Sequence, residues 1–118
     1  MFIEGTVVHG NRLGGRMGIP TANVEVDEGV QAPDGVYAAR VFVDGRSYDA
    51  MANLGCKPTV GGRRRLLEAH LFDFEGDLYG HRIRVELQRF LRPERRFDTL
   101  EELFRQIGED RRAIRGGE

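Results

Sequence analysis

The chain has 118 residues, of which 40% are hydrophobic and 31% are charged, and its formal net charge is −1. This length suits one globular domain with its own core, so we expect a single domain over residues 1–118. The charge balance gives no support to broad binding of nucleic acid, and no apolar run approaches the roughly 18 residues that a membrane span needs. The single cysteine cannot form an internal disulfide and no signal-peptide pattern follows Met1, which favours a cytoplasmic protein.

Strand patterns dominate the chain from its start. Residues Phe2–Val8 are expected to open a sheet, and Val36–Val43 alternates between two largely apolar faces, which indicates a strand. Asp44-Gly45 is the dipeptide of a tight two-residue hairpin. The return strand then carries one face of small and apolar residues, Tyr48, Ala50, Ala52 and Leu54.

The second half of the chain adds two strands and a helix. Leu66–Phe74 is a further strand candidate, and Arg82–Gln88 alternates between a buried and a wet face. Thr99 and Glu102 form a capping box, and Gly116-Gly117 should stop the helix. The apolar stripe of this helix consists of Leu100, Leu103, Phe104, Ile107 and Ile114. Strands joined by short turns and followed by one helix predict a mainly β fold, a small antiparallel barrel.

A glycine-rich loop precedes two oxygen-bearing side chains. Its glycines are Gly10, Gly14, Gly15 and Gly18, whose backbone N–H groups would be open to phosphate oxygens. After Pro20, Thr21 and Asn23 would point to the same face of an extended segment. A hydroxyl and an amide oxygen are hard ligands that suit Mg²⁺. The alternative is a glycine-rich surface loop that ends in a turn.

Two further segments could carry chemistry. Glu68 lies in mid-strand and shares a face with His70, which is compatible with a general base for an alcohol or with an exposed acid on the wet side of a sheet. The planes of Arg92 and Arg95, with the ring of Phe97, could bracket a flat heterocycle. They could equally belong to a solvated connection between strand and helix.

These segments together resemble the riboflavin kinase family. The matches run in order through almost the whole chain, and the most specific is Pro20-Thr21-Ala22-Asn23. The others are Gly5-Thr6-Val7-Val8-His9-Gly10, Gly18-Ile19, Gly35-Val36-Tyr37-Ala38, Ala52-Asn53-Leu54-Gly55, Pro58-Thr59, Glu68-Ala69-His70-Leu71, Asp73-Phe74, Leu78-Tyr79-Gly80, Leu91-Arg92-Pro93-Glu94 and Phe97.

The resemblance implies a six-stranded Greek-key barrel closed by a C-terminal helix. It also implies transfer of the γ-phosphoryl group of ATP to the 5′-hydroxyl of riboflavin, which yields FMN and ADP. Thr21 and Asn23 would then bind Mg²⁺, and Glu68 would be the base. The ATP site would further include Gly10, Gly15, Arg16, Gly18, Pro20, Leu71, Asp73 and Tyr79. Arg92, Arg95 and Phe97 would contact the flavin.

Members of this family occur alone or joined to an FMN adenylyltransferase module, so this chain is either a single-function kinase or a module of a bifunctional protein. Without that module it should stop at FMN. One rival interpretation is a flavin-binding or regulatory module that has lost catalysis. Another is an RNA-binding module, because Gly15-Arg16-Met17-Gly18 fits a backbone-clamping Gly-x-x-Gly loop. That loop should join two helices, whereas Pro20 and a β-type sequence follow it here.

Overall fold

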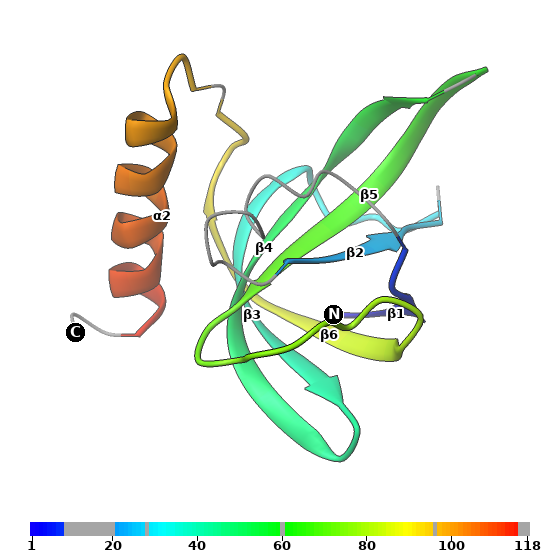
Figure 1. The fold of residues 1–118 in the computed structure, drawn as a ribbon. Helices are drawn as coiled ribbons and strands as arrows, with labels where there is room; N and C mark the ends of the chain where they lie inside the picture. Colours follow the sequence, from blue (N-terminus) through cyan, green and yellow to red (C-terminus); the bar gives the residue numbers. More distant parts are fainter. Residues whose placement is uncertain (9–20, 28, 60, 96, 116–118) are drawn as a thin grey trace.

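A computed structural model of the chain describes residues 1–8, 21–27, 29–59, 61–95 and 97–115. The described part contains six antiparallel strands and one C-terminal helix (Figure 1). The strands are β1 (Phe2–Thr6), β2 (Thr21–Glu25), β3 (Gly35–Val43), β4 (Arg46–Thr59), β5 (Gly62–Leu71) and β6 (Arg82–Arg92), and the helix is α2 (Leu100–Ile114). No helix within these ranges is long and apolar enough to cross a membrane.

The sheet has the order β1-β6-β3-β4-β5-β2. Strands β3, β4 and β5 follow one another as hairpins and β6 returns beside β3, which is a Greek key. The two edge strands approach each other where the Val8 N–H donates to the Asn23 carbonyl over 2.8 Å, so the sheet is a nearly closed barrel. The predicted mainly β barrel with a C-terminal helix is confirmed.

Strict alternation builds the interior of the barrel. Ala50, Ala52 and Leu54 of β4 point inward, as do Leu67 and Ala69 of β5. Neighbours along each strand point outward, and β3 supplies apolar residues to both sides because Val36 belongs to a second cluster outside the barrel. That second cluster, made of Val36, Met51, Phe72, Leu91, Ile107 and Ile114, joins the outer face of the sheet to α2.

Local signals explain the ends of several elements. Asp44 and Gly45 have φ values of 51° and 77°, as a type I′ hairpin turn requires, so the predicted two-residue hairpin is confirmed. Strand β5 ends at Leu71 and not at Phe74 as predicted, because Asp73 adopts a left-handed φ of 59°.

The start of helix α2 departs in one detail from the expected capping box. The Thr99 side chain accepts a hydrogen bond from the Glu102 N–H over 3.2 Å, as expected. The Glu102 carboxylate accepts in return from the N–H of Asp98, one residue earlier than a capping box requires. The helix ends at Ile114, and the predicted stop at Gly116-Gly117 lies outside the described residues.

Candidate functional site

One row of side chains crosses five neighbouring strands on the outer face of the barrel. Asn23 of β2 pairs with Glu68 of β5, which pairs with Asn53 of β4. Asn53 pairs with Val36 of β3, and Val36 pairs with Arg92 of β6. Residues directly opposite each other in a sheet point to the same side, so the pairing gathers the row on one surface.

A bulge in β6 places Arg92 at the end of this row. Val36 pairs with Arg92 and the next residue, Tyr37, pairs with Phe90, which leaves Leu91 as an extra residue in β6. Such a bulge turns the side chains that follow it and ends the regular pairing. Arg92 is therefore directed toward the space under helix α2.

The adjacent row brings Thr21 against His70. These two residues are paired across β2 and β5, and Thr21 Oγ1 lies 3.3 Å from His70 Nδ1. Burial lowers the pKa of the His70 imidazole below its ordinary value, although the Glu68 and Asp110 carboxylates act in the opposite direction. The imidazole beside Thr21 is therefore neutral at pH 7 and adds no positive charge to the site.

Two buried amide oxygens in the row have no hydrogen-bond partner among the described residues. They are Oδ1 of Asn23, whose residue is 5% exposed, and Oδ1 of Asn53. A buried carbonyl oxygen without a partner is costly and is often completed by water, an ion or a ligand. Asn23 Oδ1 and Thr21 Oγ1 are hard oxygen donors on one face of β2, so this pair fits a hard divalent cation such as Mg²⁺.

The described residues contain no group of three or more His, Cys, Asp or Glu side chains that could hold a metal by itself. A magnesium ion that takes most of its ligands from phosphate and water needs only one or two from protein. The donor set at Thr21 and Asn23 matches that pattern.

A cavity of about 160 Å³ lies over the row and beneath the helix. Its walls come from the barrel, from the connection between β6 and α2, and from the apolar side of α2. The lining residues are Thr21, Val36, Met51, Asn53, Glu68, His70, Arg92, Arg95, Phe97, Leu103 and Ile107. The structure thus collects around one cavity five of the residues that the sequence singles out, namely Thr21, Glu68, Arg92, Arg95 and Phe97.

The other predicted site residues do not line this cavity. Asn23 lies in the row beside Glu68 but is not among the residues that line the cavity. Leu71 is buried in the barrel core and, with Asp73, borders a second hollow of about 920 Å³ between the end of β5 and helix α2. Asp73 forms ion pairs there with Arg111 and Arg115. Tyr79 lies half exposed on the connection between β5 and β6. Gly10, Gly15, Arg16, Gly18 and Pro20 lie outside the described residues.

Sequence reasoning assigned no role to Asn53, Gln106 and Asp110. Asn53 stands between Ala52 and Leu54 in a strand of buried small and apolar residues, and a lone amide in such a strand is a recognisable signal. Asp110 falls on the same helical stripe as Ile107 and Ile114, where a charged residue is unusual. The partners of Gln106 and Asp110 become visible only in the folded chain.

The chain matches one known protein family over nearly its whole length. Residues 1–116 match the flavokinase family, whose description is riboflavin kinase. The chain belongs to this family. The predicted resemblance is thereby confirmed.

Curated relatives carry this module within longer proteins. The Escherichia coli K12 bifunctional riboflavin kinase/FMN adenylyltransferase is 47% identical over 109 residues, which cover 92% of this chain and 35% of that protein. The Bacillus subtilis protein of the same description is 40% identical over 119 residues, which cover 97% of this chain and 38% of that protein. The chain therefore spans little more than a third of the length of these relatives.

Two solved structures share the fold. A Trypanosoma brucei riboflavin kinase superposes with a TM-score of 0.66 at 26% identity and covers 98% of this chain and 77% of that one. A Streptococcus pneumoniae structure described as a macrolide-efflux protein gives a TM-score of 0.88 at 35% identity, over 97% of this chain and 38% of that one.

Proposed function

We propose that this chain transfers the γ-phosphoryl group of ATP to the 5′-hydroxyl of riboflavin and releases FMN and ADP. The observation that carries the proposal is the cross-strand row in which Glu68 lies between Asn23 and Asn53, with Glu68, Asn53 and the neighbouring Thr21 lining one cavity. A carboxylate beside a pair of metal-type oxygen donors is the equipment that phosphoryl transfer to an alcohol requires. Membership of the flavokinase family supports the same reaction.

Thr21 and Asn23 would hold Mg²⁺ through their side-chain oxygens. When bound, that ion offsets the negative charge of the ATP phosphate oxygens. His70 Nδ1 lies 3.3 Å from the Thr21 hydroxyl, and this contact would help to orient the hydroxyl. Ala22, between the two ligands, is anchored in the barrel core, so both oxygens are carried by a rigid strand.

Glu68 would accept the proton of the attacking hydroxyl. A primary alcohol is far too weak an acid to ionise beforehand, so the proton leaves as the new P–O bond forms. Glu68 is second in the row, directly beside Asn23 on β2, and Asn53 and Val36 separate it from the arginine on β6. This position lets it meet a hydroxyl that arrives from the helix side while the phosphate approaches from the β2 side.

The flat ring of riboflavin would occupy the helix side of the cavity. Phe97, Leu103 and Ile107 supply apolar surface there. Arg92 and Arg95 supply planar cations, and the Arg95 guanidinium lies 5.2 Å from the centre of the Phe97 ring. Aromatic and guanidinium planes of this kind stack on heterocycles and donate to their carbonyl oxygens.

An assay with riboflavin, ATP and Mg²⁺, resolved by chromatography, tests the proposal. We expect equimolar FMN and ADP, dependent on Mg²⁺, and no FAD from this chain alone. Binding of riboflavin without turnover would instead support a flavin-binding module. RNA binding that weakens with salt and does not respond to riboflavin would support the RNA-binding interpretation.

A further inference from the structure

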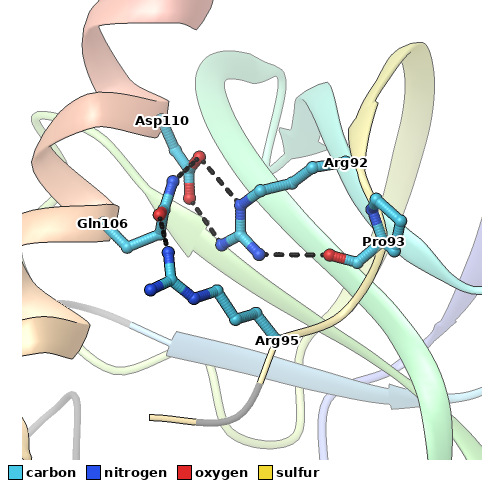
Figure 2. Close-up of polar contacts among 5 residues, drawn as sticks. All are labelled: Arg92, Pro93, Arg95, Gln106 and Asp110. Atoms are coloured by element: carbon cyan, nitrogen blue, oxygen red, sulfur yellow. Dashed lines mark hydrogen bonds and ion pairs between the residues drawn. The ribbon is translucent and has the colours of Figure 1, made fainter.

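A polar network joins helix α2 to the last residues of β6 and the connection that follows (Figure 2). The Asp110 carboxylate accepts from Arg92 Nε over 3.2 Å and from Arg92 Nη2 over 2.9 Å. It also accepts from Gln106 Nε2 over 3.1 Å, and the Gln106 carbonyl oxygen accepts from Arg95 Nη1 over 2.9 Å. One carboxylate therefore orients both arginines, Arg92 directly and Arg95 through Gln106.

Asp110 is buried to an unusual degree for a charged residue. It is 4% exposed, and no other charged residue among those that the structure describes is buried. Burying a carboxylate is costly, and a buried ion pair is seldom more stabilising than an apolar pair of similar volume. Ile107 and Ile114 already hold this face of the helix against the barrel. A contribution to the stability of the fold therefore explains the charge at Asp110 poorly.

The network includes two residues of the wall of the cavity that Glu68 lines. Arg92 and Arg95 both line that cavity, and Arg92 ends the row that contains Glu68. The connection between them is held from another side as well, because the Glu94 carboxylate fills the space that a side chain at Gly55 would occupy. Both arginines are thus held in one geometry before any substrate arrives.

We propose that Asp110, with Gln106, is a positioning residue for the acceptor substrate. It sets the two guanidinium planes against which the flavin ring binds, so that the ribityl hydroxyl reaches Glu68. This inference rests on the proposed function. It concerns riboflavin and not ATP because the metal donors Thr21 and Asn23 lie on β2, at the opposite end of the row from Arg92.

The test compares Asp110→Asn, which keeps the size of the side chain and removes its charge, with the control Glu109→Gln on the exposed side of the same helix turn. Riboflavin binding is measured by flavin fluorescence without ATP or metal, and KM and kcat are then measured for each substrate. For Asp110→Asn we expect riboflavin Kd and KM to rise about ten-fold, the equivalent of one charge-assisted hydrogen bond. We expect the ATP KM and kcat at saturation to stay within about two-fold, the pattern of lost ground-state binding.

A second variant, Gln106→Leu, keeps both hydrogen bonds between Arg92 and Asp110 and removes the two that Gln106 makes, one to the Asp110 carboxylate and one from Arg95. We expect riboflavin Kd to rise about three-fold, less than for Asp110→Asn, because the hydrogen bond from Arg95 to Gln106 is exposed to water while Arg92 stays paired with Asp110. A melting curve checks that the variant is folded. If Asp110→Asn does not fold, the riboflavin affinity of Gln106→Leu tests the role of the network. Unchanged riboflavin affinity in the folded variants, or equal losses for riboflavin and ATP, would overturn the inference. If the wild-type chain itself forms no FMN, the proposed function fails; if it is active and the folded variants match it, only the role of Asp110 fails.

Discussion

Replacing Glu68 by glutamine would remove the proposed base with little change in shape. The row places Glu68 directly between Asn23 and Asn53, and Oδ1 of each asparagine is buried without a partner among the described residues. Directly paired side chains have Cβ atoms about 5 Å apart, so the new amide N–H group can reach one of these oxygens. We therefore expect Glu68→Gln to unfold at the same temperature as the wild type or at a higher one.

Turnover should fall sharply in the same variant. Removal of a positioned general base lowers kcat by about 10²–10⁴-fold, which corresponds to roughly 2.7–5.4 kcal/mol of transition-state stabilisation. His70 cannot take over the role, because two residues along a strand span about 7 Å and place it too far from the hydroxyl. Riboflavin affinity should be largely retained, since the side of the cavity that we propose for the flavin ring is unchanged.

The measurement is the initial rate of FMN formation at saturating riboflavin and Mg·ATP, with riboflavin binding by fluorescence and a melting curve for each protein. Glu25→Gln is a matched control, because Glu25 lies on β2 near the site but pairs at the surface with Arg64 over 3.0 Å. Near-normal turnover in Glu68→Gln would remove Glu68 from the mechanism. An equal loss of turnover in Glu25→Gln would show that the rate responds to the loss of any negative charge near the site and not to Glu68 in particular.

Three further changes test the proposed metal ligand Asn23, the barrel and the helix. Asn23→Ala should raise the Mg²⁺ concentration for half-maximal rate by about ten-fold, the energy of one charge-assisted contact, and an unchanged Mg²⁺ dependence would contradict the ligand role. Gly5→Ala should lower the free energy of unfolding by about 1–3 kcal/mol in urea, because the new Cβ would overlap Val24 Cγ1. The control Gly29→Ala meets no atom within 4 Å and should not destabilise the fold. Thr99→Ala should cost about 1 kcal/mol, since it removes the acceptor for the Glu102 N–H; a loss below the error of the urea titration would exclude the cap as a stabilising element.

Much of the fold follows from signals that act over a few residues. Alternation along β4 and β5 separates the buried face from the face that carries Glu68, because successive side chains on a strand point to opposite sides. The Asp44-Gly45 turn and the Thr99 cap are set by the backbone preferences and hydrogen bonds of the residues themselves. The spacing of Thr21 and Asn23 likewise places both oxygens on one face.

Tertiary structure alone decides which of these faces meet. The row from Asn23 to Arg92 depends on the register of four strand pairs that join distant parts of the chain, and no local pattern specifies that register. Asp110 is a charged residue on an otherwise apolar stripe of the helix. Its position is explained only by its contact with Arg92, which lies 18 residues earlier in the chain. The sequence by itself therefore determined the strands, their faces and the candidate donors, because these depend on near neighbours. Only folding placed Glu68 between its two asparagines and set the buried Asp110 carboxylate behind the arginines, because those positions depend on pairing across the barrel.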